Sequence, residues 1–208
     1  MKSNEMLTKA TIWAATVNIR YIVGFHEYVL EQLGIKEREI VEKIARHKEK
    51  DKELVDLKIE RNLYSETYKN NLMVNTFLML YSHLEEWLYL IWRKFGKNIE
   101  LKGKRGSISK YKPFFQVVFK MDLSKDKDWN ILKDAQKIRN CLLHANGRID
   151  MVKNKAEMSD IIKRYKSQLF IKTKRLCIKQ ELVEIFFGSI QSVIYKVDKL
   201  QKNAQNHR

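Results

Sequence analysis

Helix breakers are scarce in this chain, and their scarcity constrains the fold more than any other feature. Its 208 residues include one proline and seven glycines. Proline removes a backbone donor and glycine lowers helix stability by roughly 1 kcal/mol, so long segments without them favour helices. Across most of these segments apolar residues recur three and four positions apart, which is the spacing of one helix face. The sequence therefore predicts an all-α protein, an antiparallel bundle of four to six helices.

Three long helices are expected from this spacing. The first covers residues 5–33 and ends at Gly34, the second covers 71–95 and ends at Gly96, and the last is about 24 residues long. Their apolar faces consist of Ala10, Trp13, Val17, Tyr21, Phe25 and Tyr28 in the first; Phe77, Leu80, Tyr81, Leu84, Leu88 and Ile91 in the second; and Val183, Phe186, Ile190, Val193, Val197 and Leu200 in the last.

The segments between these helices are more polar. Residues 35–63 are expected to form a charged helical hairpin insertion, in which the apolar-free run 46–53 is either a solvated face or a turn. Residues 97–112 form a basic loop with Glu100 as its single acid, and a short helix follows near 113–121. A short β element is expected near 169–178, and residues 201–208 form a tail. Because no repeat or low-complexity linker interrupts the chain, we expect a single domain over 1–208.

The overall charge is strongly positive. The chain has 41 Lys and Arg against 25 Asp and Glu, a formal net charge of +16. This excess favours a polyanionic partner, although it does not separate RNA from DNA or from an acidic protein. The two cysteines, Cys141 and Cys177, are too few for a disulfide framework or a metal site, and Cys141 is expected to pack rather than to react.

No segment is expected to enter a membrane. The most apolar window, residues 72–92, is interrupted by Asn75, Ser82, His83 and two glutamates, which are costly in a bilayer. Residues 1–5 lead into an amphipathic helix, so no secretory signal is expected. We therefore expect a cytoplasmic protein.

The run 137–147 carries the most chemically suggestive residues. Arg139, Asn140 and His144 lie on a predicted helix over residues 126–146, which Ser124 or Asp126 could cap. At about 100° per residue, Arg139 borders an apolar stripe, while Asn140 and His144 lie one turn apart on the polar flank. The apolar stripe is made of Ile131, Ala135, Ile138 and Leu142.

The spacing of arginine and histidine is not decisive by itself. A chain with five histidines and this many arginines should contain about one such spacing by chance. A second match does occur at Arg20 and His26, which we interpret as ordinary residues of a helix surface. Without further context, the favoured interpretation of Arg139 and His144 is a solvated helix flank.

The run 137–147 resembles the active-site helix of the HEPN ribonuclease superfamily. In that motif an arginine is followed by a polar residue, a few mostly apolar residues and a histidine, here Arg139, Asn140, Leu142, Leu143 and His144. The helical pattern over residues 70–200 matches the fold that the resemblance implies. Abortive-infection and phage-defence proteins of the family are the most similar in character.

The resemblance implies an endoribonuclease without a cofactor or metal. Histidine suits proton transfer at neutral pH, so His144 could act on the attacking 2′-OH or the leaving 5′ oxygen. Arg139 could stabilise the charged transition state through its planar fork, and Asn140 could hold the imidazole or contact the phosphate. One His144 cannot easily serve as both base and acid, and the family is known for composite sites in two-fold homodimers.

Further residues are candidates for supporting roles. Glu85 follows a leucine, as does a glutamate in related HEPN helices that faces the motif helix, and it could orient Arg139; alternatively it faces solvent. His83 is expected to be a surface or partly buried polar residue. The basic loop could grip RNA through Lys102, Lys104, Arg105 and Lys110, or could simply be solvated.

The chain departs from one group of relatives. Toxins paired with nucleotidyltransferase antitoxins often carry a tyrosine two residues after the motif histidine, where this chain has Asn146. Neutralisation by that route is not expected, although another antitoxin or regulatory protein could be a partner. Two alternatives stay open at this point: a non-catalytic HEPN module that binds RNA, a nucleotide or a protein, and an unrelated basic helical dimer.

Overall fold

The fold is an all-α bundle with one small β-hairpin. A computed structural model describes residues 2–47, 52–102 and 106–206, with side chains described over 12–47, 52–102 and 106–200. The elements are α1 (Lys2–Arg46), α2 (Lys52–Asn62), the π-helical turn η1 (Leu63–Tyr68), α3 (Lys69–Phe95), the 3₁₀ turn η2 (Ile108–Tyr111), α4 (Lys112–Phe119), α5 (Lys127–His144), the 3₁₀ turn η3 (Ile149–Met151), α6 (Lys155–Arg164), β1 (Leu169–Lys172), β2 (Arg175–Ile178) and α7 (Gln180–Asn206).

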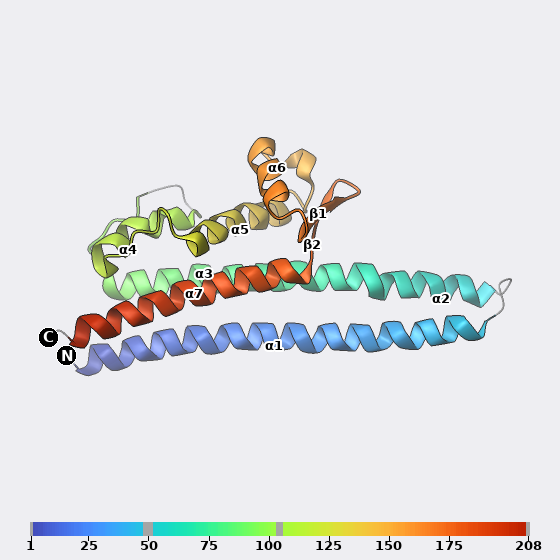
Figure 1. The fold of residues 1–208 in the computed structure, drawn as a ribbon, viewed down its shortest axis with the longest axis horizontal. Coiled ribbons are helices and arrows are strands. Elements are labelled where there is room, and N and C mark those ends of the chain that lie inside the picture. Colours follow the sequence, from blue (N-terminus) through green and yellow to red (C-terminus); the bar gives the residue numbers. More distant parts are fainter. Residues whose placement is uncertain (1, 48–51, 103–105, 207–208) are drawn as a thin grey trace.

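Three long rods form the base of the bundle. Helix α2, the π turn and α3 follow one another without a break, and this rod lies beside α1 and α7 (Figure 1). Helices α4 and α5 cover the side of α3 and α7 that faces away from α1, with α6 and the hairpin above them. Counting the joined rod once, the described residues contain six helical rods, so the predicted all-α bundle with a short β element is confirmed.

The core follows the predicted faces of two helices. Every apolar residue expected on the buried face of α3 is buried, and so is the a/d seam of α7 up to Val197, while Leu200 is partly buried. Phe186 of α7 stacks with Phe77 and Tyr81 of α3, with ring centroids 4.7 and 6.1 Å apart. These aromatic contacts join the two helices that support α5.

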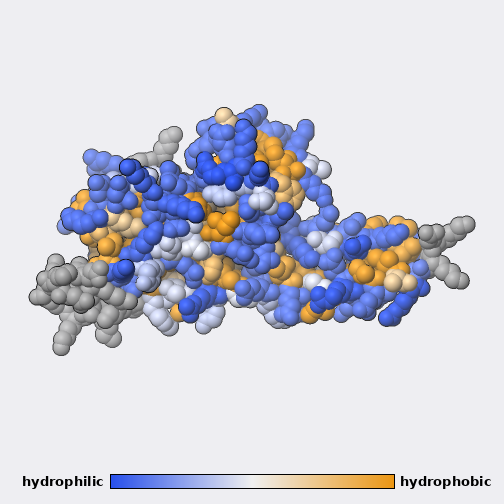
Figure 2. All heavy atoms as spheres, viewed as in Figure 1, coloured by the Kyte–Doolittle hydropathy of each residue, from blue (hydrophilic) through white to orange (hydrophobic). Residues whose placement is uncertain are grey.

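Helix α1 does not end at Gly34, as the sequence predicted, but continues to Arg46. Burial beyond the glycine explains the difference: Ile40 is buried, and Lys69 binds Glu37 at 2.7 Å. These contacts outweigh the roughly 1 kcal/mol that a mid-helix glycine costs. The distal half of α1 and α2 therefore form the expected hairpin as a projection of two long rods (Figure 1). Figure 2 shows hydrophobic side chains near its tip, where Val55 and Ile59 are exposed.

The other surprise in α1 is the face that it buries. Ile12, Ala15 and Ile19 pack into the core, whereas the predicted aromatic face points to solvent. Its four aromatic side chains are largely exposed: Trp13 by 68%, Tyr21 by 73%, Phe25 by 58% and Tyr28 by 61%. Helix α1 is therefore apolar on two opposite sides.

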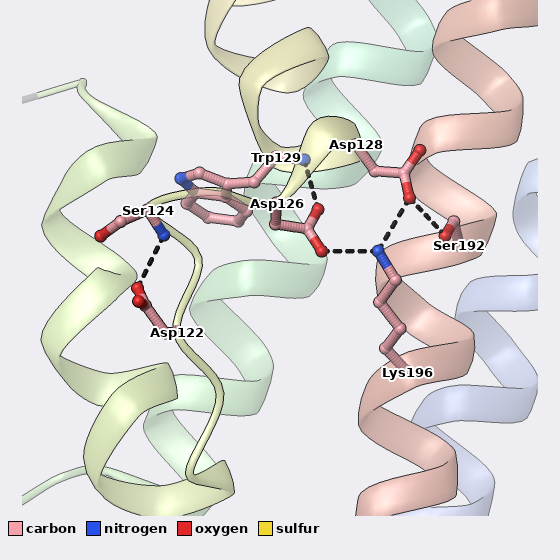
Figure 3. Close-up of polar contacts among 7 residues, drawn as sticks. All are labelled: Asp122, Ser124, Asp126, Asp128, Trp129, Ser192 and Lys196. Carbon is pink, nitrogen blue, oxygen red and sulfur yellow. Dashed lines mark hydrogen bonds and ion pairs between the residues drawn. The ribbon is translucent and has the colours of Figure 1, made fainter.

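The start of α5 is fixed by a polar cluster between α5 and α7 (Figure 3). Of the two predicted caps, Asp126 is the one used, because its carboxylate accepts a hydrogen bond of 2.8 Å from the Trp129 amide. Lys196 reaches Asp126 at 2.6 Å and Asp128 at 2.8 Å, and Ser192 donates to Asp128 at 2.6 Å. Burial opposes ionisation, but the bonds from Lys196 and Ser192 outweigh it and hold the pKa of Asp128 below its ordinary value.

The end of α5 is fixed by the residues that follow the motif histidine. The helix ends at His144, and the Gly147 amide donates back to the Cys141 carbonyl at 3.0 Å. Asn146 and Gly147 both have positive φ, at 48° and 74°, which suits these two residue types. The Gly147 carbonyl then accepts from Leu176 of β2 at 2.9 Å, so the hairpin holds the end of the helix.

Two other expectations concern the ends of the chain and the membrane. Residues 201–206, expected as part of a tail, continue α7. Across the described helices, none has a stretch of the length and apolar character that a bilayer span requires.

Candidate functional site

The three motif residues line one cleft beside α5. A cavity of about 420 Å³ is bordered by Arg139, Asn140 and His144. The rest of its lining comes from the segment 106–109, from the preceding turns of α5 and from Glu157 of α6. Arg139 and Asn140 are half-buried, and His144 is exposed. The side chains that the sequence singled out therefore meet at an open surface rather than in the core.

Arg139 is held by contacts on three sides. Its Nη1 donates to Asn140 Oδ1 at 3.1 Å, and its Nη2 lies 3.7 Å from Glu85 Oε2 on α3. The guanidinium also lies over the Tyr81 ring, 5.6 Å from the centroid. An arginine fixed by a carboxylate, an amide and an aromatic face is positioned before a ligand arrives, which lowers the entropic cost of binding a phosphate.

Glu85 therefore does what the sequence suggested as one of two alternatives. It is half-buried and pairs with Arg139, whereas its neighbour Glu86 is exposed. Burial, followed by the negative charge of Glu85, raises the pKa of the nearby Tyr111 phenol to about 12. Tyr111 is therefore neutral near pH 7.

A second cleft of about 620 Å³ meets the first at His144. The two share Lys137, Asn140, His144 and Glu157, so these side chains form the ridge between them. Within the described part of the chain, the His144 imidazole has no hydrogen-bond or ion-pair partner. Its side chain is open to both clefts.

Sequence reasoning missed several residues at this site. Lys133 and Lys137 line the clefts, and Lys137 lies 3.1 Å from Glu157. Helical spacing could have found both lysines, because they precede His144 by eleven and seven residues, about three and two turns. Glu157 comes from α6, and no spacing within α5 could have indicated it.

Among the described residues of the predicted basic loop, those that line the cleft lie within the segment 106–109. Gln136 of α5 donates to the Gly106 carbonyl at 2.6 Å and accepts from the Ile108 amide, which anchors the loop against the cleft. Lys110 is half-buried over the Tyr111 ring, and Lys102 is exposed near Glu100. The other two cations predicted to bind RNA, Lys104 and Arg105, lie outside the described residues.

Two other predicted roles can be compared with their surroundings. Cys141 is buried, as expected for a packing residue, and burial raises the pKa of its thiol to about 11. His83 is buried rather than superficial, with Nε2 2.9 Å from the Ala15 carbonyl. Across the described residues, no group of three His, Cys, Asp or Glu side chains is placed to hold a metal ion.

The second arginine–histidine match was wrongly interpreted as a pair of surface residues. Arg20 is exposed, but His26 is buried and shares a hydrogen bond of 2.8 Å between its Nδ1 and Thr76 Oγ1. The cause is the unexpected orientation of α1, which buries the face that carries His26. Arg20 and His26 therefore do not share an open surface.

Comparisons with protein families, with curated proteins and with solved structures find no match. The resemblance of residues 137–147 to the HEPN motif thus stays a prediction.

Proposed function

We propose that this protein is a metal-independent endoribonuclease, acting in the cytoplasm as a toxin or phage-defence effector. The observation that supports it most is the convergence of Arg139, Asn140 and His144 on one cleft, with Arg139 held by Glu85. These side chains have the chemistry that RNA self-cleavage requires: a proton-transfer group beside a fixed positive fork. Lys133 and Lys137 add positive charge where a phosphate backbone would approach.

In the proposed reaction, the 2′-OH of RNA attacks the adjacent phosphorus and the bond to the 5′ oxygen breaks. The imidazole of His144 removes the proton from the 2′-OH, and Arg139 donates hydrogen bonds to the phosphate oxygens as charge develops there. The leaving 5′ oxygen must gain a proton, which a second His144 from a homodimer partner would supply. The products are a 2′,3′-cyclic phosphate and a 5′-hydroxyl.

A chimeric oligonucleotide tests the mechanism directly. A DNA strand with a single ribonucleotide should be cut only after that ribonucleotide, and the matched all-DNA strand should survive, because only the former has a 2′-OH. Cleavage should persist in excess chelator and disappear in His144→Ala. Equal cleavage by His144→Ala, or loss of activity in chelator, would contradict the proposal.

An inactive wild type would point to the alternative. If the wild type binds the RNA strand but never cleaves it, under conditions in which it is dimeric, the chain is a non-catalytic helical module. A non-catalytic module would need no antitoxin or regulatory protein for its production. Toxicity on expression that His144→Ala relieves would instead support the nuclease in cells.

A further inference from the structure

We propose that the exposed aromatic face of α1 is a self-association surface, on which a second copy of this chain packs. The surface comprises Trp13, Tyr21, Phe25 and Tyr28 of α1 with Leu78 and Met79 of α3, and a groove of about 820 Å³ runs between the two helices. This inference goes beyond the proposed function and does not depend on it.

The surface is unusual because α1 is apolar on both sides. An amphipathic helix at a protein surface normally turns its polar face outward. Here the inward face packs through Ile12, Ala15 and Ile19, and the outward face has aromatic side chains instead of charges. From residue 12 to residue 28 the only Lys, Arg, Asp or Glu residues are Arg20 and Glu27. Such a contiguous exposed apolar face marks a contact with another surface.

Its area approaches that of a dimer interface. An aromatic side chain presents about 150–250 Å², so four that are 58–73% exposed offer about 500 Å². Met79, which is 46% exposed, and the half-buried Leu78 extend the surface toward the roughly 800 Å² that each partner contributes to a standard interface. Aromatic residues are also those that contribute most binding energy at interface centres.

Charge favours a second copy over a polyanion. Two chains of net charge +16 repel each other unless they meet through a neutral patch, and this aromatic face is the least charged part of α1. If two α1 helices cross antiparallel about a two-fold axis at Gly24, Arg20 of each copy lies near Glu27 of the partner subunit. One surface would thus be complementary to itself, as a two-fold interface requires.

Gly24 supports this crossing point. It is an exposed glycine in the middle of α1, where glycine costs roughly 0.5–1 kcal/mol relative to alanine. A Cβ added there would meet nothing within 4 Å, so no contact within the monomer explains the absence of a side chain. A second helix crossing at this position would explain it, because the two backbones could then approach closely.

The surface lies apart from the candidate site. Helix α5 and its clefts cover the side of α3 and α7 that faces away from α1, so a dimer through this face does not by itself bring two His144 side chains together.

The first experiment measures mass in solution without RNA. Light scattering over a wide concentration range should give twice the chain mass for the wild type. The double variant Tyr21→Glu/Phe25→Glu should dissociate, with association weakened by about 100-fold or more, because hot-spot residues contribute 2 kcal/mol or more each. Val117→Glu, at a position on α4 that is 56% exposed, is the matched control and should stay dimeric.

The outcomes separate the interface from the nuclease. A wild type that is monomeric throughout, or a double variant that dimerises normally, overturns the proposal; unchanged helicity and thermal midpoint in the double variant exclude misfolding. A monomeric wild type that sediments with anionic vesicles would assign the surface to lipid instead, and also overturn it. If the wild type dimerises through this face but cuts no RNA, the interface stands and the proposed function fails.

Discussion

Two arginine–histidine pairs of similar spacing occur in this chain, and the fold places them in opposite ways. On α5, Arg139 and His144 both border an open cleft with Asn140 between them. On α1, Arg20 is exposed while His26 is buried against Thr76. The same two residue types at nearly the same spacing thus form a candidate site in one helix and a surface residue plus a core residue in the other.

The difference lies in which arc of the helix is covered. Residues five and six positions apart point about 140° and 120° apart, so neither pair shares a narrow face. On α5 the arc between the two side chains, where Asn140 lies, opens to the cleft. On α1 one arc between Arg20 and His26 packs into the core through Ile19, and the other carries the aromatic surface. Tertiary packing, and not spacing, decides which pair can reach a ligand.

The largest effect on cleavage should be the difference between the two arginine variants. Arg139→Ala should lower RNA cleavage by about 100-fold or more, because it removes the donor fixed for the transition state. Arg20→Ala should leave the cleavage rate unchanged at every protein concentration, because Arg20 is exposed on α1, away from the cleft beside α5. Single-turnover cleavage at several concentrations measures both, with Arg61→Ala on α2 as an exposed control. Concentration-dependent rescue of Arg139→Ala would contradict its role in the site.

For stability, the larger effect should come from the histidine on α1 and the smaller from the histidine on α5. His26→Ala should lower the free energy of unfolding by about 2–3 kcal/mol, because it leaves a cavity and the buried Thr76 hydroxyl without its partner. His144→Ala should change it by less than about 0.5 kcal/mol, because the side chain is exposed. Urea unfolding followed by circular dichroism measures both values. A large loss in His144→Ala would mean that His144 is structural.

The sequence predicted those parts of the fold that depend on periodicity within one helix. The buried faces of α3 and α7 were both visible as apolar spacing. The persistence of α1 past Gly34 was not, because it depends on the distant Lys69–Glu37 pair. Likewise, α1 has two apolar faces, and its sequence alone does not say which one meets α3.

The same limit applies to the candidate site. Its α5 residues could be predicted because they belong to one motif, and Glu85 could be suggested because of its place in a second helix. Glu157 and the Tyr81 ring enter through packing between helices that are distant in sequence. Contacts of this kind are set by how the rods stack, which a single sequence does not reveal.

A smaller effect is expected at the carboxylate that orients Arg139. Glu85→Gln should lower cleavage by about 10-fold, because the amide keeps a hydrogen-bond acceptor but loses the charge that fixes the guanidinium. Substrate affinity should change less than the maximal rate. The control is Glu42→Gln, the same substitution at an exposed position on the distal part of α1. An unchanged rate in Glu85→Gln would make the ion pair incidental to the site.

The smallest effect should be a pH dependence of stability that comes from His26 and not from His144. Burial lowers the pKa of His26 below 6.5, against the opposing charges of Glu27 and Glu184. Its Nε2 is buried without a hydrogen-bond partner among the described residues, so a second N–H there would be unsatisfied. With the folded pKa below the unfolded one, the unfolded chain binds more protons as the pH falls below 6.5, and stability declines toward the folded pKa. This decline should persist in His144→Ala and flatten in His26→Leu, when free energies of unfolding are compared across that range. If the free energy of unfolding of His26→Leu fell with pH as steeply as that of the wild type, another group would be responsible. The two pairs would then differ in the exposure of their histidines but not in pH dependence.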